Sequence, residues 1–372
     1  MNKNKIWLSS PHMGGAEQKY INEAFNTNWI APVGENIRVF EELLENYLKK
    51  SFVSALQSGT SAIHLALKLA GVGKDDFVLC QSNSHIASAN PITYEAATPV
   101  FIDSEADTWN MSPELLEKAI KDLIAKGTKP KAIVVVHLYG MPAKMQEIMA
   151  IAKQYDIKVI EDAAEALGST YQGQKCGTLG DYGILSFNGN KIITTSGGGA
   201  LVTKTESDKQ KAIFWATQAR DNAPHYQHSE IGYNYRMSNI VAGIGRGQME
   251  VLDLRVQQRR ANFDFYVNEL KNLPVQLAPI PSKEFFSNRW LSTILTDSFE
   301  TREKLRLALD AENIEARPLW KPMHMQPVFE NNLAYTNGVS EDLFNRGLCL
   351  PSGSNMTDND RKRVVETIKK VF

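Results

Sequence analysis

Short apolar runs alternate with segments of helical periodicity along the first half of the chain. The runs have the length of buried strands and end in polar or small residues; they cover 77–82, 98–104, 132–140 and 158–166. Segments whose apolar positions recur with helical spacing surround them, at 61–70, 113–126 and 143–155. Strands that alternate with helices predict an α/β fold with a mostly parallel sheet covered on both faces.

The pattern changes after about residue 245, where a long charged segment, 248–273, leads into helix-rich sequence that continues to the C-terminus. A chain of 372 residues also exceeds the usual size of one hydrophobic core. We therefore expect a large domain over 31–251 and a smaller C-terminal domain over 252–372. The N-terminal segment, 1–30, is expected to pack with the smaller domain.

Polar clusters follow three of the predicted strands. They are QSNSH at 81–85, HLYG at 137–140 and EDAAE at 161–165. The parallel strands of an α/β sheet present their carboxyl ends at one edge, and ligands collect there. The sequence therefore predicts a binding site built from these clusters.

Composition narrows the kinds of ligand. The chain has 41 basic and 42 acidic residues, so its net charge of −1 favours neither nucleic acid nor an anionic membrane. The cysteines, Cys80, Cys176 and Cys349, lack zinc-binding spacing and are expected to be reduced thiols in a cytoplasmic protein. The N-terminus lacks the apolar region of a signal peptide, and no apolar run is long enough to cross a membrane.

Gly59, Thr60 and Ser61 open an apolar helix and form the first candidate subsite. Unpaired backbone N–H groups at a helix start, with the positive end of the helix dipole, suit a phosphate group. An ordinary Ser or Thr N-cap explains the same residues and is favoured when this stretch is taken alone.

Asp162 and Lys191 are two further candidates. Asp162 ends a predicted strand beside two alanines, where a carboxylate suits a protonated ring nitrogen; a helix cap or a salt bridge explains it equally well. Lys191 precedes glycines 197–199, which allow a backbone to pass close to a ligand. A nucleophilic lysine must lose its proton near neutral pH, whereas a lone loop lysine is usually only solvated.

The combination of the three sites indicates one cofactor. A helix-end phosphate site, a carboxylate for a ring nitrogen and a loop lysine, in that chain order on an α/β sheet, are what pyridoxal 5'-phosphate requires. The phosphate anchors the cofactor, the carboxylate keeps its ring nitrogen protonated, and the lysine forms a Schiff base with its aldehyde.

The whole chain resembles the sugar-nucleotide aminotransferases of the DegT/DnrJ/EryC1/StrS family. The matching stretches run from end to end: SGTSAIHLAL, TPVFIDSEADTWNM, VIEDAAEALGS, SFNGNK, GYNYRMSNI and RPLWKPMH. The resemblance implies the fold-type I architecture of aspartate aminotransferase, with a large, mostly parallel sheet of the seven-stranded type and a smaller α+β domain. SSPHMGG, NWIAPVG and SFNGNKIITTSGGG are most similar to enzymes that aminate C4 of a UDP-linked 4-keto-6-deoxy-N-acetylglucosamine on the way to bacillosamine.

By that resemblance, Lys191 is the Schiff-base lysine and Asp162 is the partner of the pyridine nitrogen. The phosphate of the cofactor is expected near the helix start and the strand before the lysine, at Gly59, Thr60, Ser61 and Ser186. Asn234 corresponds to a residue that the neighbouring subunit supplies to the phosphate. The resemblance therefore implies a homodimer whose subunits share the active site.

Three more residues are expected beside the cofactor. His85 holds the position of the ring-stacking aromatic residue, although a strand-end histidine bonded to backbone explains it as well. Glu165 stands where many relatives carry Gln or His near the ring hydroxyl, so an acid here departs from the commoner pattern. Asn188 lies in a tight SFNGN turn whose own chemistry accounts for an asparagine.

Four residues match family positions near the sugar nucleotide or border its pocket: Met13, Trp29, Arg236 and His324. A salt bridge is the alternative explanation for Arg236, and core packing is the alternative for the other three.

The resemblance implies that the enzyme transfers an amino group from L-glutamate to the C4 ketone of the sugar, with Lys191 moving a proton as general base and acid. A dehydratase, or an aminotransferase acting at C3 or on a dTDP- or GDP-linked sugar, is the nearest alternative; dehydrating relatives replace the lysine with histidine. A dinucleotide-binding oxidoreductase needs GxGxxG, a spacing that glycines 197–199 lack. A non-catalytic protein that has kept the fold is the last alternative. Such a protein is free to lose Lys191 or Asp162, and this chain has both.

Overall fold

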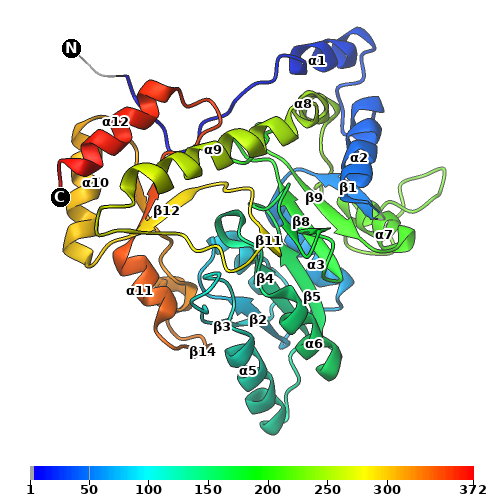
Figure 1. Ribbon diagram of the computed structural model, residues 1–372. Helices are drawn as coiled ribbons and strands as arrows, with labels where there is room; N and C mark the ends of the chain where they lie inside the picture. The colour runs from blue at the N-terminus through cyan, green and yellow to red at the C-terminus, as the bar shows by residue number, and fades with distance from the viewer. Residues whose placement is uncertain (1–3, 50) are drawn as a thin grey trace.

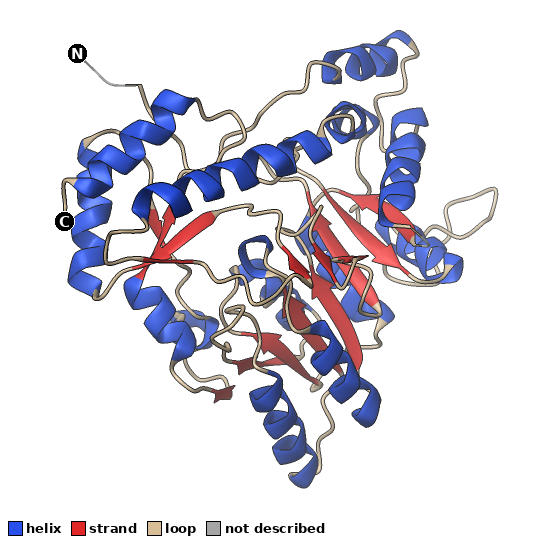
Figure 2. Ribbon diagram, in the orientation of Figure 1, coloured by secondary structure: helices blue, strands red, loops and turns tan. Residues whose placement is uncertain are grey.

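The computed structural model describes residues 4–49 and 51–372, and its main element in this range is an eight-stranded sheet (Figure 1, Figure 2). The strand order is β1-β9-β8-β5-β4-β2-β3-β14. Neighbouring strands pair in parallel except at β9, which runs antiparallel to β1 and β8. The strands are β1 (Phe52–Leu56), β2 (Phe77–Gln81), β3 (Thr98–Ile102), β4 (Ala132–Val136), β5 (Lys158–Asp162), β8 (Tyr182–Ser186), β9 (Gly199–Thr203) and β14 (Ala334–Tyr335).

The apolar runs of the sequence become β2, β3, β4 and β5, so the predicted mostly parallel α/β sheet is confirmed. Each strand begins at the first residue of its run and ends within or just before the polar cluster, and the rest of the cluster forms a loop at the carboxyl edge. Seven strands of this sheet, β1 to β5 with β8 and β9, lie before residue 204 and form the expected seven-stranded core. A short strand from the C-terminal part of the chain, β14, pairs with β3 and extends this sheet at one edge.

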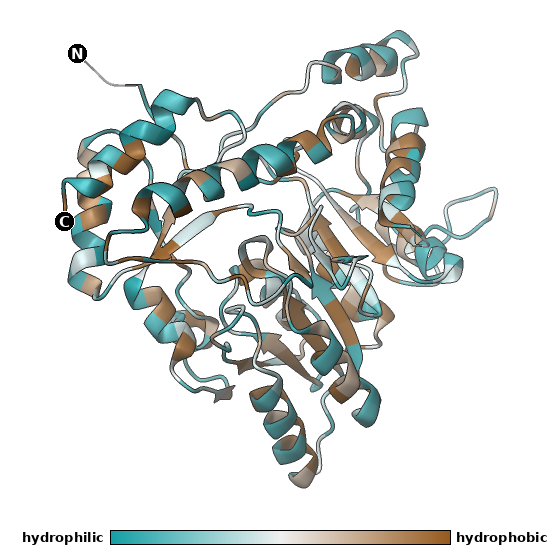
Figure 3. Ribbon diagram, viewed as in Figure 1, coloured by the Kyte–Doolittle hydropathy of each residue, from teal (hydrophilic) through white to brown (hydrophobic). Residues whose placement is uncertain are grey.

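Helices cover both faces of the large sheet. Clusters of buried side chains join one face to α2, α5 and α6, and the other face to α3, α4 and α7. Neighbouring residues of β4 point to opposite sides, with Val134 in one cluster and Ile133 in the other. Figure 3 shows the strands mostly in the hydrophobic colour, as expected for a sheet buried on both faces. The helices are α2 (Glu35–Leu48), α3 (Gly59–Leu69), α4 (Asn90–Tyr94), α5 (Pro113–Ala125), α6 (Met145–Tyr155) and α7 (Glu206–Ala216).

A second sheet, with strand order β10-β12-β15-β13, forms the core of the C-terminal part. Its apolar side chains pack against α9, α10 and α12, seen at the left and top of Figure 1. The strands are β10 (Gln276–Leu277), β12 (Ser292–Leu295), β13 (Arg317–Pro318) and β15 (Gly347–Leu350). The helices are α9 (Leu252–Leu270), α10 (Phe299–Ala311), α11 (Val339–Arg346) and α12 (Asp358–Lys369). A small third sheet combines β6 (Thr170–Tyr171), β7 (Gln174–Lys175) and β11 (Phe285–Phe286).

The N-terminal segment contacts both parts of the molecule. Ile6 forms a parallel bridge with Ile314 and is buried in the apolar cluster of the second sheet. Helix α1 (Glu17–Asn26) packs instead against α8 (Asn239–Met249), next to the large sheet. In the described part of the chain, no helix is both long and apolar enough to cross a bilayer.

Asp103 connects the large sheet to the C-terminal part. It follows β3, is fully buried, and its Oδ1 accepts hydrogen bonds from the backbone N–H groups of Ser104 at 2.7 Å and Ser340 at 3.0 Å. Its Oδ2 accepts from the N–H groups of Asn337 and Gly338, both at 3.0 Å. Because Gly338, at the N-cap of α11, has no side-chain oxygen, Asp103 supplies the acceptor for the start of that helix.

We expect Asp103→Ala to lower the free energy of unfolding by about 3 kcal/mol, because four N–H groups, those of the buried Ser104 and Ser340 among them, lose a charged acceptor at once. Chemical denaturation followed by circular dichroism measures the change. Asp107→Ala is the matched control, since the Asp107 side chain is 63% exposed and its surface ion pair with Lys144 contributes about 1 kcal/mol at most. Equal stabilities of the two variants would contradict this role for Asp103.

Candidate active site

A cavity of about 650 Å³ lies at the carboxyl edge of the large sheet, large enough for a cofactor and part of a substrate. Its walls come from three parts of the chain: the sheet edge, the N-terminal residues 7–9, and the second-sheet region around 290 and 315–320. The predicted site residues that line it are Gly59, Thr60, His85, Asp162, Glu165, Ser186, Asn188 and Lys191.

The start of α3 forms one end of this cavity. Ser58 is the N-cap of α3, and its Oγ accepts a hydrogen bond from the Ser61 N–H at 3.0 Å. The Ser61 hydroxyl lies 2.8 Å from Ser58 Oγ and is buried behind it, so Ser58, and not Ser61, lines the cavity with Gly59 and Thr60. The geometry is that of an ordinary Ser cap that also faces an open anion-sized space.

Gly199 allows β9 to approach this helix start closely. A Cβ at Gly199 would lie 2.3 Å from the carbonyl carbon of Ser58 and 2.4 Å from the Gly59 nitrogen. The sequence predicted that glycines 197–199 let the backbone approach a ligand. At Gly199 the close neighbour is the Ser58–Gly59 backbone itself, while Gly197 and Gly198 line the cavity.

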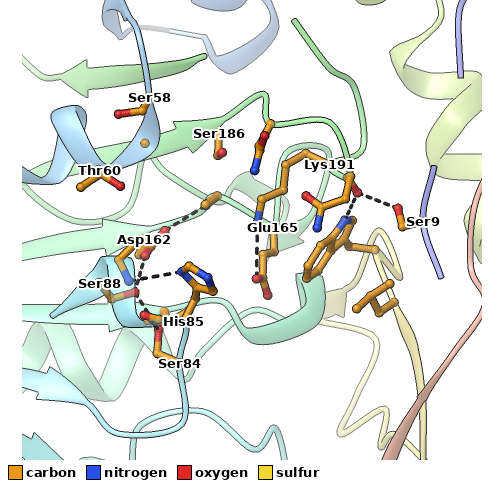
Figure 4. Close-up of a pocket in the computed structure, with 18 of the residues that line it drawn as sticks. Ser9, Ser58, Thr60, Ser84, His85, Ser88, Asp162, Glu165, Ser186 and Lys191 are labelled. Atoms are coloured by element: carbon orange, nitrogen blue, oxygen red, sulfur yellow. Dashed lines mark hydrogen bonds and ion pairs between the residues drawn. The ribbon is translucent and has the colours of Figure 1, made fainter. Parts of the chain in front are cut away.

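Asp162 is held at the end of β5 by short hydrogen bonds. Its Oδ2 accepts from the Ser88 hydroxyl at 2.6 Å, and its Oδ1 accepts from the Ala164 N–H at 3.2 Å. The Ser84 hydroxyl lies 2.6 Å from that of Ser88 and extends the chain of polar groups (Figure 4). These contacts orient a buried carboxylate toward the cavity.

Lys191 reaches into the cavity and ends between an acid and an aromatic ring. Its Nζ lies 3.5 Å from Glu165 Oε1, an ion pair drawn in Figure 4. The same Nζ lies 4.3 Å from the centre of the Trp290 ring, within the range of a cation–π interaction. These two contacts fix the position of the amine.

The backbone around Lys191 is also fixed. The Asn190 carbonyl accepts hydrogen bonds from the Trp290 indole N–H at 2.7 Å and the Ser9 hydroxyl at 2.6 Å. The Lys191 carbonyl accepts one from Arg259 Nη2 at 3.2 Å. Arg259 is fully buried, and burial lowers its pKa to about 9. The lysine loop is therefore held by α9, the second-sheet region and the N-terminal segment together.

Glu165 has an unusual protonation equilibrium for a carboxylic acid. Burial raises its pKa from 4.5 to about 7, and the nearby Asp162 charge acts in the same direction. Lys191 and the Tyr139 N–H, which donates to Glu165 Oε2 at 2.7 Å, oppose this shift. Glu165 therefore changes its charge near neutral pH.

His85 faces the cavity from the loop after β2. Its Nδ1 accepts a hydrogen bond from the Ala87 N–H at 3.2 Å, so the neutral ring carries its proton on Nε2. The ring centre lies 5.6 Å from that of Trp320. Surrounding protein atoms and then the Lys191 charge lower its pKa, so His85 is neutral at physiological pH. The structure thus combines both sequence-based explanations: a backbone-bonded histidine that faces the cofactor space.

Arg236 and His324 do not line the cavity of the single chain. Arg236 pairs with Glu41 and donates to the Ala55 carbonyl at 3.0 Å, the salt-bridge arrangement named as its alternative. His324 Nδ1 lies 2.6 Å from Ser82 Oγ, and its Nε2 lies 3.1 Å from Glu341 Oε1. Both side chains are held by neighbours of their own.

Met13, Trp29 and Asn234 also lie outside the cavity of one chain. Met13 is 50% and Trp29 is 55% exposed, which excludes core packing in the single chain as their explanation. Asn234 is exposed, and its backbone bridges to Thr217. Exposed positions of this kind are available to a second subunit.

Comparison with known proteins places the chain in a family. The model of the DegT/DnrJ/EryC1/StrS aminotransferase family matches residues 11–369. The chain belongs to this family. It is 54% identical over 373 residues to EpsN of Bacillus subtilis (strain 168), covering 99% of this chain and 96% of EpsN. It is 37% identical over 367 residues to the GDP-perosamine synthase of Escherichia coli O157:H7, covering 99% and 98%.

A solved structure gives the same assignment. The PLP form of Spr1654 from Streptococcus pneumoniae matches with a TM-score of 0.92 at 26% identity, over 99% of this chain and 98% of that one. The chain is thus a pyridoxal-phosphate-dependent aminotransferase that acts on nucleotide sugars. The predicted family, fold, enzyme class and cofactor are confirmed.

The cavity of this aminotransferase fits the cofactor chemically. The start of α3, a buried carboxylate and a lysine amine face one space, as pyridoxal phosphate requires. The sequence did not identify Ser58, Ser88, Trp290 or Arg259. Ser58 had a local signal, because a serine between a strand and a helix is a common N-cap. The described residues contain no cluster of three or more His, Cys, Asp and Glu side chains arranged for a metal.

We expect the stability of the cofactor-free protein to depend on pH through Glu165. The raised pKa means that the folded state holds the proton more tightly than the unfolded chain, so this stabilisation is full below pH 4.5 and is lost as pH rises through about 7. Between pH 5 and pH 8 the wild type should therefore lose about 2 to 3 kcal/mol of unfolding free energy that Glu165→Gln keeps, because glutamine does not titrate. Urea unfolding at both pH values measures this.

Glu147→Gln is the matched control, because Glu147 is an exposed residue of α6. Its stability should follow that of the wild type at both pH values. If Glu165→Gln also followed the wild type, Glu165 would not titrate near pH 7.

Proposed function

We propose that this enzyme transfers the amino group of L-glutamate to the C4 ketone of a UDP-linked 4-keto-6-deoxy-N-acetylhexosamine. The product is a UDP-linked 4-amino-4,6-dideoxy sugar of the bacillosamine type. The observation that carries the proposal is the convergence of Lys191, Asp162 and the start of α3 on one cavity. We further propose that the reaction takes place in the cytoplasm, where the buried Cys80, Cys176 and Cys349 stay reduced.

The proposed roles follow from the contacts of each side chain. Bound pyridoxal phosphate supplies an aldehyde for the amino group and a ring that withdraws electrons from the reacting carbon. The N–H groups of Gly59 and Thr60, with the hydroxyls of Thr60, Ser58 and Ser186, hold the phosphate. Asp162 keeps the ring nitrogen protonated. Lys191 takes a proton from one carbon and returns it to another, as general base and acid.

The assignment to a UDP-linked sugar rests on three stretches of sequence, and two of them border the cavity. SSPHMGG contributes Ser9, while SFNGNKIITTSGGG contributes Asn188, Asn190 and Lys191. These residues line the same cavity as the lysine amine, which the reacting part of a substrate must enter. Met13, Trp29, Arg236 and His324 are proposed to contact the sugar nucleotide in the assembled enzyme.

A GDP-linked 4-keto-6-deoxy sugar is the second candidate substrate. The 37% identity to a GDP-perosamine synthase over nearly the whole chain favours it. Both candidates require the same chemistry at C4 and differ in the nucleotide and in the substituent at C2 of the sugar.

We expect purified enzyme, cofactor and L-glutamate to aminate a UDP-linked 4-keto-6-deoxy-N-acetylhexosamine with the highest kcat/KM of a panel of UDP-, GDP- and dTDP-linked keto sugars. Mass spectrometry of the products and release of 2-oxoglutarate measure the reaction. Preference for the GDP-linked sugar would replace the first candidate with the second.

Lys191→Ala tests whether Lys191 carries the proton in the reaction. It should lose at least about a thousandfold in kcat, because the proton carrier is removed. Lys153→Ala is the matched control and should keep full turnover, since Lys153 is exposed on α6 and does not line the cavity. Full turnover by Lys191→Ala would reject the assignment of the lysine.

We also propose that the active site is completed by Asn234 of a second subunit. Asn234→Ala and Lys191→Ala should each be inactive alone, and mixing them after mild unfolding should restore up to about a quarter of wild-type activity. This follows because, in random pairs, half of the dimers are mixed and each mixed dimer holds one intact site. Activity assays before and after remixing measure it; mixtures that stay inactive would contradict a shared site.

A further inference from the structure

The charged side chains that line the cavity divide into two groups. Within the described residues they are Asp162, Glu165, Lys191, Glu315 and Arg317. The first three face the space assigned to the cofactor under the proposed function. The remaining two form an ion pair on the wall contributed by the second-sheet region, and the proposed chemistry does not use them.

Glu315 is the fixed member of this pair. Its Oε2 accepts a hydrogen bond from the Leu8 N–H at 2.9 Å, and its side chain is only 18% exposed. Burial by itself would raise the pKa of Glu315, but the hydrogen bonds from Leu8 and Arg317 outweigh it and lower the pKa. The carboxylate therefore stays charged and holds its place at neutral pH.

Arg317 is the open member of the pair. Its Nε and Nη2 lie 2.8 Å and 2.7 Å from Glu315 Oε1, while its side chain is 70% exposed. The guanidinium has five N–H donors, and one carboxylate oxygen uses only part of them. Such an exposed pair contributes about 1 kcal/mol or less to the stability of the fold. Its contribution to stability therefore does not explain why the pair is present in the cavity wall.

Both substrates bring negative charge to this cavity. L-Glutamate carries two carboxylates, and a nucleotide sugar carries a diphosphate. Apart from Lys191, which is committed to the chemistry, Arg317 is the one cationic side chain among the described lining residues. Its planar fork of donors matches the oxygens of a carboxylate or a phosphate.

We propose that Arg317 is the anion-binding residue of this cavity and that Glu315 positions it. The guanidinium contacts the carboxylate of the amino donor, the diphosphate of the sugar nucleotide, or each in turn as the two substrates alternate. The inference rests on the proposed function, because it assigns the two substrates to this cavity.

The test compares Arg317→Gln with Arg317→Lys and the wild-type holoenzyme. One arm measures the glutamate half-reaction by the absorbance change of the cofactor and extracts the apparent dissociation constant and the limiting rate. The other arm measures the binding of UDP, and of GDP in parallel, by calorimetry. We expect Arg317→Gln to weaken one or both by about tenfold with the limiting rate unchanged within about twofold, and Arg317→Lys to recover part of the loss.

Arg306→Gln is the matched control. Arg306 belongs to α10, pairs with Glu303 and does not line the cavity, so the same loss of charge there should change neither constant. A loss confined to glutamate identifies the donor carboxylate, and a loss confined to the nucleotide identifies the diphosphate. Unchanged affinities in both arms would overturn the proposal.

The two proposals fail in different ways. If the wild-type enzyme aminated no nucleotide sugar of the panel, the proposed substrate would be wrong, while the glutamate arm would still decide the role of Arg317. If the wild type aminated its sugar and Arg317→Gln bound both ligands normally, only the role of Arg317 would be wrong.

Discussion

The constraint on which the site depends is the fixation of the loop that carries Lys191. A flexible lysine has many rotamers, so a single useful position requires that its backbone be held from several directions. Here the carbonyls of Asn190 and Lys191 accept hydrogen bonds from Trp290, Ser9 and the buried Arg259. Each donor comes from a different part of the chain. The lysine therefore acquires its position only when the N-terminal segment, α9 and the second-sheet region are all in place.

The same arrangement also fixes the side chain of Lys191. Its Nζ lies between Glu165 and the face of Trp290, and Trp290 also donates its indole N–H to the neighbouring carbonyl. One tryptophan thus contacts both the backbone of the lysine loop and the lysine amine. Glu165, in turn, is oriented by the N–H of Tyr139, a residue with a φ of 52° in the loop after β4. These contacts link the position of the amine to the carboxyl edges of two strands.

The sequence allowed prediction of the parts of the site that depend on local pattern. The strands end where the apolar runs become polar, so the edge that holds Asp162, and the helix start at Gly59, follow from periodicity and capping. Arg259 and Trp290 gave no such signal, because their contacts with Lys191 connect residues far apart in the chain. Ser61 was a reasonable choice for the phosphate from its position near the helix start, but the cap formed by Ser58 draws it inward. The role proposed for Asn234 needs a second subunit, so it comes from the family resemblance and not from the pattern of one chain.

The two walls of the cavity differ in burial and in the number of partners. On the sheet edge, Asp162 and Glu165 are buried and each has several partners, so a substitution there disturbs neighbours that the fold also needs. On the other wall, Arg317 is exposed and pairs with a single carboxylate, that of Glu315. A substitution of Arg317 therefore costs little stability. Under the proposed roles, the buried wall holds the groups of the amino transfer, while the exposed wall offers a guanidinium to the anionic groups that both substrates carry.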